Sequence, residues 1–245
     1  MNKAVIVGAT SGIGSEVAKL LLDEGWTIGI AGRREYRLEE LRRLAPDRVF
    51  VQTIDICRDD APDRLQQLIS AMGGGIDLYF HASGVGKQNP NLDIEIELDT
   101  LYTNCLGFVR MIDMAYKYFE QNNDRGGHIA IISSIAGTKG IGVAPSYSAT
   151  KRMQSIYLES LAQLAHIKHL NIKFTDILPG FVDTDLLNDQ KHYPMLMKPQ
   201  NVARHIVRAI KRKKRTAIID WRYRLVVAVW RIFPLCWWER LNIRN

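Results

Sequence analysis

Residues 3–14 read KAVIVGATSGIG, and this stretch decides the fold. Its first five residues form a short apolar run of the kind that makes a buried β-strand. Glycines follow at positions 8, 12 and 14, and residues 16–22 then place apolar side chains at helical spacing up to Gly25. Strand, glycine turn and helix in this order predict a unit whose helix N-terminus offers free N–H groups to a phosphate. The alternative is a turn with a structural role only.

Further apolar runs and helical patterns alternate along the chain. The expected strands are 27–31, 49–54, 76–80, 127–133, 172–178 and 216–220, and the expected helices are 35–44, 61–72, 98–121, 145–168 and 201–211. This alternation predicts an α/β, single-domain Rossmann fold: a doubly wound, mostly parallel sheet of about seven strands with helices on both faces. With 245 residues and 47% hydrophobic content, the chain can bury one large core. We expect residues 1–220 to form a dinucleotide-binding catalytic domain and residues 221–245 to add a basic, Trp-rich helical extension.

The net charge of +7 is unevenly distributed. Residues 198–245 hold thirteen Lys or Arg against two acids, a local +11, which leaves residues 1–197 at −4. The main body is therefore mildly acidic, and no nucleic-acid partner is expected. The three cysteines, at 57, 105 and 236, are far apart and have no metal-ligand spacing, so we expect neither disulfides nor a metal site, and a reducing, cytoplasmic location.

Residues 134–151, SIAGTKGIGVAPSYSATK, carry the candidate chemistry. If Pro145 opens a helix, Tyr147 and Lys151 lie one turn apart on the same face. A neighbouring ammonium lowers the pKa of a phenol from its usual value near 10, which would let the pair exchange a proton closer to neutral pH. Ser134 follows a buried apolar run and could polarise a carbonyl beside the tyrosine. The alternative is a solvated surface pair.

The end of the second expected strand points to the cofactor. An acidic residue there would bind the ribose hydroxyls of NAD(H), but the chain has Arg33 and Arg34, which suit a 2′-phosphate. NADP(H) is therefore favoured over NAD(H). The alternative is that the two arginines only begin the exposed helix over residues 35–44.

Together these motifs resemble the compact, single-domain branch of the short-chain dehydrogenase/reductase family, over residues 3 to about 220. The resemblance implies a catalytic tetrad of Asn104, Ser134, Tyr147 and Lys151, in which Asn104 anchors a proton-relay water and Lys151 also holds the ribose. It further implies a set of cofactor-binding residues after successive strands: Gly8, Thr10, Ser11, Gly12, Ile13, Gly14, Arg33, Arg34, Asp55, Ile56, Ala82, Ser83, Gly84, Tyr147, Lys151, Pro179, Gly180, Val182 and Thr184.

The chain also departs from the family pattern. Val7 stands where threonine is usual, and His81 and Ala82 stand where two asparagines are usual, so the hydrogen bonds that brace the cofactor loop must be made differently. The Asp-Gly-Gly ending of many tetrameric members is missing, since Asp220 is followed by tryptophan. We expect a homodimer through the helices that contain Asn104 and Tyr147.

The resemblance implies an NADP(H)-dependent oxidoreductase that transfers hydride between nicotinamide and a small carbonyl or secondary alcohol. The rival hypothesis is a catalytically silent dinucleotide-binding sensor or scaffold. Residues 185–199, which include His192, Tyr193, Met195 and Met197, suit a substrate lid, and a plain surface connection is the alternative.

Four of the five tryptophans lie in the C-terminal extension, among arginines. Residues 225–233 are apolar save for Arg231, which is far short of the about 20 residues that a spanning helix needs. Residues 211–240 instead suit a helix lying on an anionic membrane surface, at the inner face of a membrane, with access to a lipid-like substrate. The alternatives are packing over the active site and a subunit interface.

Overall fold

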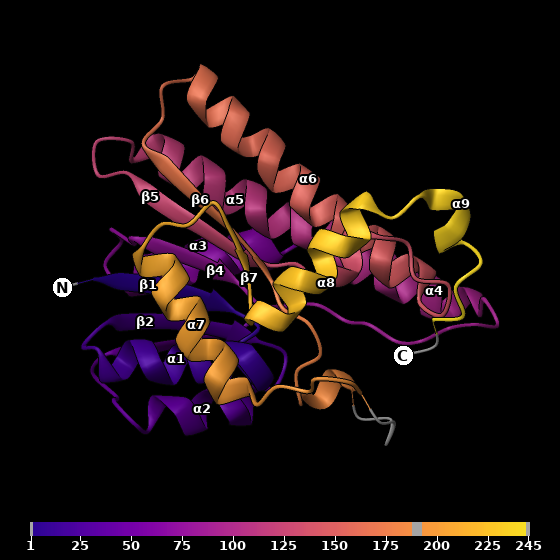
Figure 1. Ribbon diagram of the computed structural model, residues 1–245. Coiled ribbons are helices and arrows are strands. Elements are labelled where there is room, and N and C mark those ends of the chain that lie inside the picture. The colour runs from indigo at the N-terminus through magenta and orange to yellow at the C-terminus, as the bar shows by residue number, and fades with distance from the viewer. Residues whose placement is uncertain (1, 188–192, 244–245) are drawn as a thin grey trace.

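A computed structural model describes residues 2–187 and 193–243 and contains one seven-stranded sheet in the order β3-β2-β1-β4-β5-β6-β7 (Figure 1). All strand pairs in this sheet are parallel. The strands are β1 (Lys3–Val7), β2 (Thr27–Gly32), β3 (Val49–Thr53), β4 (Leu78–His81), β5 (Gly127–Ile132), β6 (Ile172–Leu178) and β7 (Thr216–Ile218). The single-domain α/β fold expected from the sequence is confirmed.

Helices cover both faces of the sheet because parallel strands need crossover connections. Residues that alternate along β1 face opposite sides: Ala4 and Ile6 belong to the core under α1, α2 and α7, whereas Val5 and Val7 belong to the core under α3, α5 and α6. The helices of this two-sided cover are α1 (Gly12–Asp23), α2 (Glu35–Arg42), α3 (Ala61–Ala71), α5 (Phe108–Gln121), α6 (Pro145–Ile167) and α7 (Pro199–Lys211), whereas α4 (Ile94–Leu101) packs on α6.

The strand order reverses between β1 and β4, which are neighbours in the sheet although β2 and β3 separate them in sequence. In open α/β sheets, ligands bind at the carboxyl ends of the strands beside such a reversal. The glycine turn after β1 and the loop after β4 both leave the sheet at this point. The fold therefore brings the candidate cofactor loops together.

The helix expected over residues 98–121 is interrupted. It starts earlier, as α4, and a π-helical turn, η1 (Tyr102–Gly107), separates α4 from α5. The N–H of Phe108, the first residue of α5, bonds to the carbonyl of Cys105 and not to that of Asn104, as an α-helix would require. This irregularity changes what the Asn104 carbonyl binds.

The C-terminal extension forms α8 (Trp221–Ile232) and α9 (Leu235–Trp238), and both pack on the rest of the chain. Tyr223 is only 1% exposed, and its hydroxyl accepts a hydrogen bond from the Phe181 N–H at 3.1 Å and donates to the Pro194 carbonyl at 3.0 Å. The Trp238 indole donates to the carbonyl of Gly140 at 2.7 Å. Across residues 2–187 and 193–243, no helix has the length and apolar character needed to cross a bilayer.

Candidate active site

The glycine turn lies tightly against the loop that follows β4. Gly8 has a φ of 94°, and a Cβ at this position would lie 2.6 Å from the Ser83 nitrogen, so only glycine fits here. Helix α1 begins at Gly12, and the side chain of its N-cap residue, Ser11, makes no capping hydrogen bond. The first N–H groups of α1 therefore point to the turn without a side-chain cap, as a phosphate site requires.

The two arginines after β2 have different surroundings. Arg34 lies against the glycine turn, where its guanidinium donates to Thr10 Oγ1 at 3.1 Å and to Ser11 Oγ. The same guanidinium pairs with Asp185 at 3.2 Å. Arg33 is exposed. Arg34 is thus the arginine that the structure holds beside the candidate phosphate site.

The remaining predicted cofactor residues also follow strand ends. Asp55 comes after β3 and accepts a hydrogen bond from the Cys57 N–H at 3.1 Å, and Thr184 comes after β6, with its methyl group 3.1 Å from where a Cβ of Gly12 would lie. The fold places the others in the same loops at the carboxyl edge of the sheet: Ile13 and Gly14 in the first turn of α1, Ile56 after β3, Ala82 and Gly84 after β4, and Pro179, Gly180 and Val182 after β6.

Ser134 and Tyr147 meet beside this edge. Ser134 is buried just beyond β5, and its hydroxyl oxygen accepts a hydrogen bond from the Ala136 N–H at 3.1 Å. Tyr147 lies in the first turn of α6, half-buried, and its ring packs against Gly86, where a Cβ would come within 2.5 Å. A hydrogen bond to Ser134 lowers the pKa of Tyr147, but burial raises it more.

Lys151 is buried one turn along α6 from Tyr147. Its Nζ lies 5.8 Å from the centre of the tyrosine ring and donates to the Ile132 carbonyl and to Gln154 Oε1, each at 3.0 Å. Burial lowers the pKa of Lys151 to about 8, against the opposing effect of the Asp176 carboxylate. The expectation that this ammonium lowers the pKa of Tyr147 was wrong for the chain alone: the net shift is upward, because burial dominates.

The Asn104 side chain braces the loop after β4. Its amide oxygen accepts a hydrogen bond from the Val85 N–H at 2.9 Å, and its amide nitrogen donates to the Val85 carbonyl at 2.7 Å. The Asn104 main-chain oxygen faces α6 and accepts a hydrogen bond from Gln154 Nε2 at 2.9 Å. Gln154 therefore connects Asn104 to Lys151, which the sequence interpretation missed. The sequence feature that could have revealed this connection is the position of Gln154, three residues after Lys151 and on the same face of the helix.

Two further buried polar residues were not among the predicted site residues. Asp176 on β6 accepts a hydrogen bond from Ser133, and burial raises the pKa of this carboxyl. His81, at the end of β4, shares a hydrogen bond with the Tyr79 hydroxyl at 3.0 Å, and burial, aided by the charge of Lys151, lowers its pKa to about 3. His81 is therefore neutral near pH 7 and adds no positive charge beside Lys151.

The expected lid segment is described only in part, because His192 lies outside the described residues. Asp185–Leu187 form a short 3₁₀ turn, η3. Met197 pairs with Val182 in a parallel bridge, and the ring of Tyr193 lies 4.8 Å from that of Phe181. The residues beyond the gap thus pack against the loop that follows β6.

Comparison with known proteins places this site in a family. Residues 2–194 match the family described as short chain dehydrogenase. The chain belongs to this family. An uncharacterised oxidoreductase of Staphylococcus aureus (strain MRSA252) is 28% identical over 228 residues, which cover 86% of this chain and 91% of that protein. An uncharacterised oxidoreductase of Mycobacterium tuberculosis (strain CDC 1551 / Oshkosh) is 27% identical over 228 residues, or 90% and 88% of the two chains.

Solved structures show the same short-chain dehydrogenase fold at lower identity. The closed form of a serine dehydrogenase complexed with NADP⁺ matches with a TM-score of 0.78 and 22% identity, over 89% of this chain and 94% of the other. A 3-ketoacyl-(acyl-carrier-protein) reductase from Brucella melitensis complexed with NADH matches with a TM-score of 0.80 and 21% identity, over 89% and 96%. One neighbour is thus complexed with NADP⁺ and the other with NADH.

Proposed function

We propose that this chain is an NADP(H)-dependent oxidoreductase that acts on a carbonyl or secondary alcohol, with Tyr147 as its general acid and base. The observation that carries the proposal is the convergence of Ser134, Tyr147 and Lys151 beside the glycine turn, at the carboxyl edge of the sheet. A silent binding fold would have no need for a tyrosine, a serine and a buried lysine at the same edge.

A nicotinamide dinucleotide fits the residues around the glycine turn. Gly8 would let the backbone approach the pyrophosphate of the dinucleotide closely, and the N-terminus of α1 faces the same turn. Arg34 adds a positive charge beside Thr10 and Ser11. When bound, the nicotinamide supplies or accepts the hydride. Arg34, with Arg33 nearby, would hold the 2′-phosphate of NADP(H), and Asp55 is proposed to contact the adenine.

Each member of the tetrad has a separate task in carbonyl reduction. The Tyr147 hydroxyl donates its proton to the substrate oxygen, and the Ser134 hydroxyl donates a hydrogen bond to the same oxygen. Lys151, whose ammonium lies 5.8 Å from the centre of the Tyr147 ring, holds the ribose hydroxyls. Asn104 holds the loop after β4 in place through its hydrogen bond to Val85. Its main-chain oxygen also holds Gln154, the residue that accepts a hydrogen bond from Lys151.

The proposal includes a homodimer. Helices α4 and α6, together with the π-turn between α4 and α5, expose large apolar side chains, which are Leu98, Leu101, Tyr102, Leu106, Ile156, Leu164 and Ile167. Apolar residues on adjacent helices are typical of a subunit interface. Light scattering of the purified chain measures the assembly directly.

A screen of carbonyl compounds and alcohols, followed by NADPH absorbance, tests the activity. We expect NADPH oxidation with at least one carbonyl or NADP⁺ reduction with at least one alcohol. The rival hypothesis, a silent sensor or scaffold, predicts dinucleotide binding without turnover across the whole screen.

A further inference from the structure

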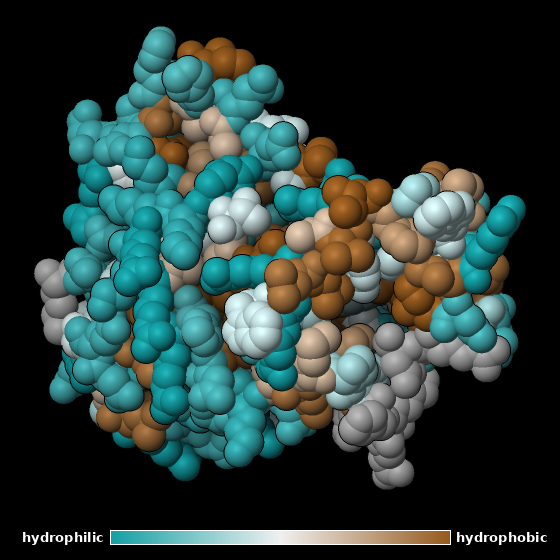
Figure 2. All heavy atoms as spheres, viewed as in Figure 1, coloured by the Kyte–Doolittle hydropathy of each residue, from teal (hydrophilic) through white to brown (hydrophobic). Residues whose placement is uncertain are grey.

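The α8–α9 segment carries an apolar surface that faces away from the domain. Trp221, Leu225, Val229 and Ile232 recur every three or four residues on α8, so they form one stripe along the helix, and all four are exposed. Trp221 is 66% exposed and Ile232 82%. The stripe continues beyond Pro234 with Leu235, Trp237 and Leu241, which are also exposed. Figure 2 shows apolar side chains gathered over α8 and α9.

The opposite face of α8 packs against the core of the domain. Tyr223 and Val227 are each 1% exposed and belong to the core, and Trp230 packs against that core. On the chain beyond α8, the Lys139 ammonium donates to the Phe233 carbonyl at 3.0 Å and so fixes the turn into α9. Helix α8 is therefore anchored to the domain by one buried face, and its other face is apolar and exposed to solvent.

Arginines border the apolar stripe. Arg224 and Arg231 are seven residues apart, so they share one flank of α8, each immediately before a stripe residue. Both are exposed, as is Arg240 after α9. Residues 221–243 contain four arginines and one acidic residue, Glu239, so the surface is positively charged.

We propose that the α8–α9 surface binds an anionic lipid bilayer, lying in the interface with its tryptophans and aliphatic side chains among the headgroups. An apolar stripe with tryptophans, bordered by arginines, matches the needs of a helix that lies on a membrane. The bordering cations attract anionic headgroups. A second copy of the chain fits less well, because a two-fold contact would bring two copies of the same positively charged surface together.

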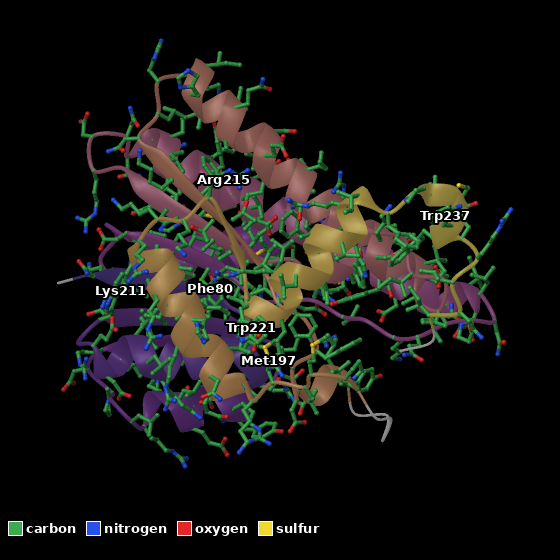
Figure 3. All side chains as sticks on the ribbon, viewed as in Figure 1. Phe80, Met197, Lys211, Arg215, Trp221 and Trp237 are labelled. Carbon is green, nitrogen blue, oxygen red and sulfur yellow. The ribbon has the colours of Figure 1, made fainter. Side chains whose placement is uncertain are left out.

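The structure changes which residues make this surface. The cationic run that begins at Lys211 and ends at Arg215 was expected to join it. In Figure 3, Lys211 and Arg215 lie across the molecule from Trp237, before β7, whereas α8 starts after that strand. The lipid-binding surface therefore consists of α8, α9 and their arginines, without the run at residues 211–215.

Co-sedimentation of the full chain with vesicles tests the proposal. A chain shortened at Asp220 would lose the buried Tyr223, so the sharper variant is Leu225→Glu with Ile232→Glu, which changes only exposed stripe residues. The matched control is Tyr36→Glu with Leu44→Glu, because these residues are 59% and 64% exposed and lie outside α8, α9 and the helices of the proposed dimer. Vesicles contain phosphatidylcholine alone or phosphatidylcholine and phosphatidylglycerol in equal parts.

The unmodified chain and the control should pellet with the anionic vesicles at low salt and bind phosphatidylcholine weakly. The stripe variant should lose at least about tenfold in vesicle affinity, because two acidic side chains replace two apolar contacts. Tryptophan fluorescence of the unmodified chain should shift to the blue and be quenched by brominated lipid, which needs no variant.

Two results would overturn the proposal. One is an unmodified chain that stays in the supernatant and shows no fluorescence change with anionic vesicles. The other is a stripe variant that pellets like the control, or that instead falls to a smaller assembly by light scattering, since the stripe would then be a subunit contact. Neither readout depends on turnover, so a failure here is distinct from a failure of the proposed activity.

Discussion

Gln154 accepts a hydrogen bond from the Lys151 ammonium at 3.0 Å, and both side chains are buried. The nitrogen of the same amide donates to the Asn104 main-chain oxygen at 2.9 Å. One side chain thus joins two members of the proposed tetrad. Its oxygen favours the charged form of Lys151 and directs the ammonium within the pocket.

Replacing Gln154 by methionine should lower the pKa of Lys151. The variant keeps a side chain of similar length but removes an acceptor from a buried ammonium, and hydrogen bonds to charged groups contribute about 1.5–3 kcal/mol, or about one to two pKa units. Titration of the ¹³Cε lysine signals by NMR measures this pKa, and Lys151→Arg identifies the signal by its loss. An unchanged pKa in Gln154→Met would mean that the amide has only a packing role.

Binding of NADPH should weaken as the pH rises through about 8. Burial lowers the pKa of Lys151 to about 8, so its ammonium is present below that pH and is lost above it. The neutral amine attracts the anionic cofactor less and donates one fewer hydrogen bond to the ribose. Fluorescence titrations between pH 7 and about 9 measure this, and Lys151→Met should bind weakly with little pH dependence. If NADPH affinity changed with pH equally in the unmodified chain and in Lys151→Met, the titrating group would be a residue other than Lys151.

The unmodified chain should prefer NADPH to NADH, and Arg34→Ala should narrow that preference. A charge-assisted hydrogen bond to the 2′-phosphate contributes about 1.5–3 kcal/mol, which is roughly tenfold or more in affinity. Arg33→Ala should act in the same direction but less, because Arg33 is exposed and Arg34 lies against the glycine turn. Parallel titrations with both cofactors decide, and equal or tighter binding of NADH by the unmodified chain would contradict the assignment.

Tyr223→Phe should lower the stability of the chain without changing its fold. The hydroxyl bridges the Phe181 N–H and the Pro194 carbonyl from a buried position, so its removal leaves these groups unpaired, at a cost of about 1–3 kcal/mol. For a chain of this size, each kcal/mol lost from the free energy of unfolding lowers Tm by about 2–4 °C. Thermal unfolding followed by circular dichroism measures the change, with Tyr36→Phe at an exposed position as the control. An equal Tm in both variants would show that these bonds are readily replaced by water.

Most of the fold could be predicted because local patterns determine it. The apolar runs that became β1 and β6 and the glycine turn after β1 are contiguous in sequence, and parallel strands with helical crossovers leave few possible arrangements. The π-turn at Asn104 could not be predicted, since apolar spacing there suits a regular helix and the turn packs against α6, which is distant in sequence. Which residues of α8 are buried likewise depends on the position of the loop after β6, because Tyr223 bonds to Phe181 in that loop.

The candidate site was predictable as a set of residues but not as a network. The spacing of Tyr147 and Lys151 follows from helical geometry alone. The contact between Gln154 and Asn104 spans 50 residues in sequence, so no local pattern reveals it. The direction of the Tyr147 pKa shift also depends on burial, which outweighs the effect of the hydrogen bond to Ser134.

The central claim is that Tyr147 is the general acid. Its most direct test compares the unmodified chain with Tyr147→Phe in an absorbance assay of NADPH oxidation, using a carbonyl substrate found in the screen. The variant removes only the proton-transferring oxygen, so we expect kcat to fall by about 10²–10⁴-fold while the Kd for NADPH stays nearly constant. A Tyr147→Phe variant with the kcat of the unmodified chain would contradict the account, because Tyr147 could not then be the general acid.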